Sequence, residues 1–126
     1  MDNNIEIITK DLKFLVNLNN SKTSLKILEE LPMESIVNRW GKEIYFKIPV
    51  YSELENGVEI VDSGTVAYWP PGSSLCIFFG KTPASTGDKP QAASPVTIIG
   101  QIIDKEILSE LEKIKDGEKI EVKKAQ

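Results

Sequence analysis

Apolar residues alternate with polar ones in several short segments of the chain, a pattern typical of strands with one buried face. The clearest case is Glu43–Pro49, in which Ile44, Phe46 and Ile48 share one face. Seven or eight short strands in a small chain must pair or close to cover their edges, so we expect one all-β domain over residues 1–126, folded as a β-barrel. The other predicted strands span 5–9, 13–19, 58–61, 65–69, 75–79, 96–103 and 119–122, with a short extended piece at 36–40.

Two segments have helical rather than alternating periodicity, one early and one late. Three leucines recur at helical spacing after an N-cap at Thr23 or Ser24, and Pro32 ends this predicted helix. Asp104 is placed to cap a second helix over Lys105–Lys115, which has one apolar side. The predicted architecture is therefore a barrel with two helices.

Small and polar residues replace large apolar ones between positions 82 and 95. A stretch of this length and composition predicts a mobile loop, which either covers a pocket as a lid or has no fixed structure. The strand predicted after it contains Gly100, which indicates a bulge or the close approach of a neighbouring backbone.

The amino-acid composition excludes several kinds of catalytic and metal site. The chain has no histidine and one cysteine, which excludes Ser-His and Cys-His nucleophile pairs, mixed Cys/His zinc sites and an internal disulfide. We therefore expect no metal and no cofactor. The formal net charge of −4 argues against a nucleic-acid partner. No apolar run approaches the roughly 20 residues of a membrane span, and no secretory signal is visible, so we expect a cytoplasmic protein without a membrane partner.

Four motifs between positions 40 and 100 are similar to known sequences: W-G-x-E-I-Y-F, A-Y-W-P-P-G, L-C-I-F-F-G-x-T-P and S-P-V-x-I-I-G. Together they resemble the small prokaryotic cyclophilin-like family, a group of atypical cyclophilin-fold proteins of unknown function. The resemblance implies a closed eight-stranded barrel with a helix over each open end.

The same resemblance allows the proline-isomerase site of true cyclophilins to be compared with this chain. It places Phe46 where a cyclophilin has its essential arginine and Cys76 where it has a pocket phenylalanine. The pocket histidine falls at about Val96, and an aromatic residue is retained at Tyr51. Arg39, the only arginine of the chain, could replace the missing one only if its segment folds over the same groove.

Side chains with one apolar body and one polar end are suited to line a ligand groove. The lining candidates are Tyr45, Tyr51, Tyr68, Trp69, Cys76 and Phe78, with Glu43 and Arg39 as polar contacts. For Trp40 we favour packing, because the adjacent Gly41 suggests a close approach of backbones.

Two candidates have chemistry of their own. Glu43, if buried, would have a raised pKa and could act as a general acid or base, although the alternation favours a solvated face. Cys76 lacks a neighbour that would lower its pKa, which favours a buried apolar role over a reactive one.

We therefore expect a protein that binds a small molecule or a peptide segment beside the barrel, without efficient proline isomerisation. Two alternatives stay open. One is a residual peptidyl-prolyl isomerase that uses Arg39. The other is an assembly protein in which an exposed aromatic rim at Tyr68 and Trp69 forms a homodimer.

Overall fold

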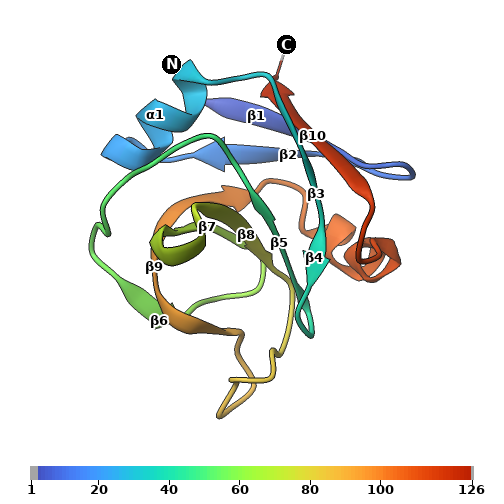
Figure 1. Cartoon of the computed structure of the whole chain (residues 1–126). Coiled ribbons are helices and arrows are strands. Elements are labelled where there is room, and N and C mark those ends of the chain that lie inside the picture. Colours follow the sequence, from blue (N-terminus) through green and yellow to red (C-terminus); the bar gives the residue numbers. More distant parts are fainter. Residues whose placement is uncertain (1–2, 126) are drawn as a thin grey trace.

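The computed structural model describes residues 3–125, which form an antiparallel β-structure with one α-helix and two 3-10 helices (Figure 1). The helices are α1 Lys22–Glu29, η1 Pro70–Gly72 and η2 Lys105–Lys113. The strands are β1 Asn4–Ile8, β2 Lys13–Leu18, β3 Met33–Ile36, β4 Asn38–Arg39, β5 Glu43–Lys47, β6 Val58–Ile60, β7 Thr65–Trp69, β8 Ser74–Phe78, β9 Gln91–Ile102 and β10 Lys119–Lys124.

The sheet closes into a barrel through one continuous segment of chain. The strand order is β3-β10-β1-β2-β9-β7-β8-β5-β4, and β3 and β4 at its two ends are separated only by Val37. Residues 33–39 therefore pair with β10 through their first half and with β5 through their second. If this segment counts as one strand, the ring has eight strands, and β6 lies outside it, paired to β9. The predicted eight-stranded barrel is confirmed.

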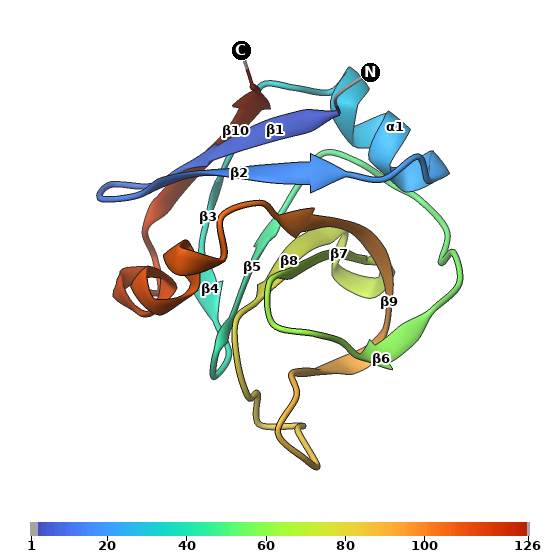
Figure 2. The ribbon, with the colours of Figure 1, turned by 180° about the vertical axis from the view of Figure 1, so that it is seen from behind.

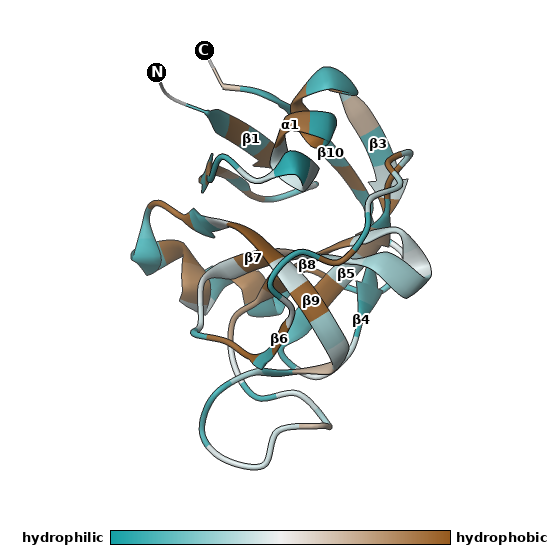
Figure 3. Cartoon of the chain, turned by 90° about the vertical axis from the view of Figure 1, so that its left-hand side faces the viewer, coloured by the Kyte–Doolittle hydropathy of each residue, from teal (hydrophilic) through white to brown (hydrophobic). Residues whose placement is uncertain are grey.

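Successive side chains point to opposite faces of each strand, which gives the molecule two apolar clusters. The barrel interior takes Ile44, Phe46 and Tyr68, together with residues from the other strands. The outer face of β5, β7, β8 and β9 carries a second cluster, which includes Cys76 and Phe78. Figure 3 shows hydrophobic segments along these strands. An apolar outer face is what allows a pocket to form outside the barrel.

The two longer helices lie on opposite sides of the barrel (Figures 1 and 2). Each contributes a fully buried side chain to the main core, Ile27 from α1 and Leu111 from η2. Asp104 caps η2 as predicted, since its carboxylate accepts from the Glu106 amide, but the helix is of the 3-10 type. No helix among residues 3–125 combines the length and the apolar character needed to cross a membrane.

The predicted N-cap of the first helix is wrong. Ser21 caps α1, since its backbone is extended and its hydroxyl accepts from the Ser24 amide at 3.1 Å. Thr23 and Ser24 lie inside the helix and are fully buried; their hydroxyls donate to Glu55 and Asn19. Because the Thr23 and Ser24 hydroxyls are engaged by residues outside the helix, Ser21 is the residue that caps it.

Removal of the cap is expected to cost about 1 kcal/mol of unfolding free energy, because Ser21→Ala leaves the Ser24 amide without its acceptor. Urea unfolding followed by far-ultraviolet circular dichroism measures this loss. Ser63→Ala, in an exposed turn, is the matched control. Equal midpoints for the two variants would contradict the assignment.

The long loop predicted at 82–95 is shorter in the structure, because β9 begins at Gln91. The remaining turn has its own hydrogen bonds: Thr82 Oγ1 donates to the Gln91 carbonyl at 2.5 Å and Ser85 Oγ to the Lys89 carbonyl at 2.8 Å. Its mobility stays a prediction.

The close approach predicted at Gly100 is confirmed. A Cβ there would press on the Asn17 carbonyl oxygen and would lie 3.2 Å from the Leu18 Cα. The pairing of β7 with β9 also shifts register beside it, between Val66 and Ala67. Only glycine lets β2 and β9 pair this closely.

Candidate functional site

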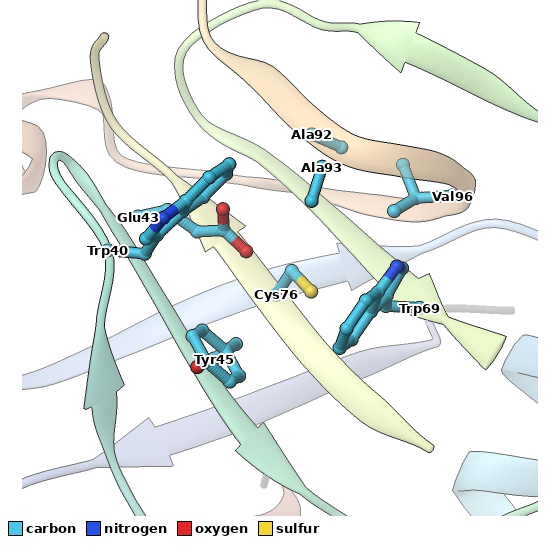
Figure 4. A pocket seen from close by; sticks show the side chains of 8 residues that line it. All are labelled: Trp40, Glu43, Tyr45, Trp69, Cys76, Ala92, Ala93 and Val96. Atoms are coloured by element: carbon cyan, nitrogen blue, oxygen red, sulfur yellow. The ribbon is translucent and has the colours of Figure 1, made fainter. Parts of the chain in front are cut away.

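A pocket of about 220 Å³ lies on the outer face of the barrel. It is smaller than the roughly 300–1,000 Å³ typical of sites for drug-sized ligands, so it suits a small group. Its walls are mostly apolar or aromatic, with one carboxylate. The lining residues are Trp40, Glu43, Tyr45, Trp69, Cys76, Ala92, Ala93 and Val96 (Figure 4).

Strand β8 runs through the middle of the site and positions the side chains on either side of it. Cys76 pairs with Tyr45 of β5 and with Ala67 of β7. The short turn between β4 and β5 then brings Trp40 opposite Glu43, since the Trp40 amide donates to the Glu43 carbonyl at 2.9 Å. The pocket is therefore built mainly on paired strands, with Trp40 added from the turn.

The Trp69 ring is held in place by two contacts. Its indole Nε1 donates to the Ser94 hydroxyl at 2.7 Å, and its ring meets that of Tyr45 edge to face, with centroids 6.4 Å apart. Ser94 belongs to the first part of β9, which also supplies Ala92 and Ala93. The end of the predicted mobile loop, for which a lid and a segment without fixed structure were both open, thus forms a wall of the pocket.

Glu43 is buried, which corrects the expectation of a solvated face. Its alternation is as predicted, but Trp40 and β9 line the same pocket, and only 5% of Glu43 is exposed. Its Oε1 has no hydrogen-bond partner among the described residues. Desolvation raises the pKa of Glu43 from 4.5 to about 7, and a hydrogen bond from the Cys76 thiol acts in the opposite direction.

Cys76 has the buried environment that its sequence neighbours suggested. Burial, and then the nearby Glu43 carboxylate, raise the pKa of its thiol well above the ordinary value. A thiol in this state is a poor nucleophile, because the thiolate is the reactive form. Cys76 therefore offers the pocket a small apolar wall and a weak hydrogen-bond donor.

The structure brings together four of the eight predicted site residues, Glu43, Tyr45, Trp69 and Cys76, and places the other four elsewhere. Tyr68 lies inside the barrel, where its hydroxyl donates to the Val50 carbonyl at 2.7 Å. Phe78 is on the outer face but fully buried in the second cluster, without lining the pocket.

The other aromatic and apolar residues predicted for the site, or aligned with it, differ in where their side chains lie. Tyr51 is 75% exposed and borders a separate hollow beside α1. Phe46, aligned with the cyclophilin arginine, points into the barrel core rather than towards the pocket. Cys76 and Val96, aligned with other pocket positions of true cyclophilins, both line the cavity.

Arg39 is engaged outside the pocket. Its guanidinium donates to the backbone carbonyls of Ile114 at 2.7 Å, Glu112 at 3.2 Å and Gly41 at 2.9 Å. It also lies over the Phe79 ring, 5.3 Å from the centroid, and pairs with the Glu112 carboxylate at 3.6 Å. These contacts fix the end of η2 to the β4–β5 turn, so Arg39 has a structural role.

The sequence did not identify every residue of the site. Trp40 lines the pocket, whereas packing was favoured for it; the close approach at Gly41 is real, but its partners are Pro83 and Lys81. Ala92 and Ala93 were assigned to the loop. The available signal was the motif S-P-V-x-I-I-G, which lies in β9 and directly follows Ala92 and Ala93.

Comparisons with known proteins agree with this architecture. A family model described as cyclophilin-like matches residues 3–123. Among solved structures, the solution structure of a hypothetical protein from Archaeoglobus fulgidus is 38% identical, with a TM-score of 0.79, and the match covers 97% of this chain and 94% of that one. No curated protein matches. Because the family model spans nearly all of the barrel, the chain belongs to the cyclophilin-like family.

Proposed function

We propose that this protein binds a small molecule, or one side chain of a peptide, in the outer pocket and does not isomerise proline bonds. The observation that carries the proposal is that the aromatic pocket and the arginine lie in different places. The pocket gathers the rings of Trp40, Tyr45 and Trp69 around a carboxylate, while the only arginine is engaged elsewhere.

A proline isomerase must lower the barrier to rotation about the peptide bond, which is roughly 18–20 kcal/mol. A guanidinium helps because it is permanently charged and donates from a fixed geometry to the peptide. Here the polar group in the pocket is Glu43, and none of the described lining residues is basic. A buried carboxylate accepts hydrogen bonds and carries no positive charge, so it cannot replace a cationic donor.

The alternative of an aromatic assembly rim receives less support from the side-chain positions. Tyr68 is buried inside the barrel, and Trp69 is half-buried against Tyr45 and Ser94. These two side chains do not form the exposed apolar patch that an oligomer interface requires.

Small fragments are expected to change the signals of both tryptophans, because the two tryptophans of the chain both line the pocket. A fragment library is screened by intrinsic fluorescence and by the chemical shifts of the indole N–H groups. Ala93→Phe is expected to abolish the response by filling the pocket. Gly87→Phe is the control, since a side chain there meets open space.

A coupled assay on a proline peptide is run with the same preparation and is expected to show only the uncatalysed rate. Turnover well above that rate, lost in Arg39→Ala, would reject the proposal in favour of an isomerase. A library without any pocket binder would reject it as well.

A further inference from the structure

The buried Glu43 carboxylate is the least satisfied polar group of the pocket. Only 5% of Glu43 is exposed, and its Oε1 has no hydrogen-bond partner among residues 3–125. Figure 4 shows the carboxylate directed into the space bounded by Trp40, Cys76 and Ala93. A carboxylate oxygen removed from water without a partner carries a desolvation cost, so a ligand that supplies a donor to Oε1 gains binding energy by relieving it.

Three aromatic rings surround the same space. The rings of Trp40, Tyr45 and Trp69 line the pocket, and the edge-to-face contact between Tyr45 and Trp69 fixes two of them relative to each other. Aromatic faces attract cations, and cages of such rings recognise ammonium groups in proteins. The Glu43 carboxylate and the aromatic rings therefore both favour a positively charged ligand group.

We infer that the ligand of this pocket presents an alkylammonium group, whose N–H donates to Glu43 Oε1 while its carbon atoms lie against the aromatic rings. The inference rests on the proposed binding function and specifies its chemistry. The volume of about 220 Å³ admits a small amine or a single lysine side chain. The formal net charge of −4 also favours the approach of a cation.

The test uses matched pairs of probes in which a neutral group replaces the ammonium group on the same carbon skeleton. Cyclohexylamine is compared with cyclohexanol, and the capped peptide acetyl-Ala-Lys-Ala-amide with its norleucine analogue. Binding is followed at pH 8 by tryptophan fluorescence and indole chemical shifts. The two pairs separate a free amine from a lysine side chain as the source of the ammonium group.

The amine of at least one pair is expected to bind about tenfold to a hundredfold more tightly than its neutral partner, which is the range of a charge-assisted hydrogen bond. Glu43→Gln is expected to remove this preference, so that the charged and the neutral probe of the pair bind with similar affinity. Glu59→Gln, on the exposed part of β6, is the control and keeps the preference.

Equal affinity for the charged and neutral probes would overturn the inference and leave the proposed binding function standing. Failure of all four probes would also overturn it, and the fragment screen would then decide separately whether the pocket binds ligands. A preference for the amine that survives Glu43→Gln would place the ammonium group elsewhere and would equally overturn it.

Discussion

The free energy of unfolding of Glu43→Gln is expected to rise relative to that of the parent protein by about 2–3 kcal/mol between pH 5 and pH 8. The cause is burial, which raises the pKa of Glu43 from 4.5 to about 7. The folded protein therefore holds a proton that the unfolded chain releases within this window. At about 1.4 kcal/mol for each pH unit of difference, the parent protein loses stability as pH rises towards 7. Glutamine has the same shape and does not titrate.

The other titratable side chains that line the pocket are Tyr45 and Cys76, and the thiol stays protonated because its pKa is raised. Urea unfolding at pH 5, 6, 7 and 8 measures the effect. Glu59→Gln is the control, and its curve should run parallel to that of the parent protein. Parallel curves for Glu43→Gln as well would show that the carboxylate is hydrated in solution and would contradict the buried geometry.

Arg39→Ala is expected to lower the free energy of unfolding by about 2–3 kcal/mol without weakening fragment binding. The loss arises because the carbonyls of Ile114, Glu112 and Gly41 lose a charged donor. The ion pair with Glu112 adds little, since that carboxylate is half exposed. Arg39→Lys should recover only a small part, because an ammonium cannot reach three carbonyls in fixed directions.

Chemical denaturation of both variants, combined with the fragment screen at a temperature where each remains folded, separates stability from binding. The control is Lys47→Ala, an exposed cation on β5 whose side chain has no hydrogen bond or ion pair among residues 3–125. A variant of normal stability that fails to bind fragments would mean that the guanidinium reaches the pocket.

Strand periodicity predicted the barrel well because its rule is local. The alternation at Glu43–Lys47 correctly separated Ile44 and Phe46 from Glu43 and Tyr45, and the structure adds what covers each face. The outer face looked solvated because the residues that cover it are distant in sequence. Ala92 and Ala93 lie about 50 residues beyond Glu43, and their small side chains gave no periodic signal.

The errors in the candidate site have a common physical origin. Tyr68 and Trp69 are neighbours in sequence and share an aromatic character, yet alternation sends one into the barrel and the other into the pocket. Assigning them together ignored the two-residue period. Arg39 was a different case, because two of the carbonyls that accept its hydrogen bonds, those of Glu112 and Ile114, lie far away in sequence, and only tertiary structure brings them close.

The position of β10 between β3 and β1 has a consequence for the order in which the barrel is completed during synthesis. Until residues 119–124 have left the ribosome, β3 lacks its partner β10 and β1 is paired on one side only, with β2, so the barrel cannot close. At that stage the nascent chain has two unpaired strand edges, one on β1 and one on β3, and each can pair with a strand of another chain. Pairing of β10 covers both of these edges in the finished barrel.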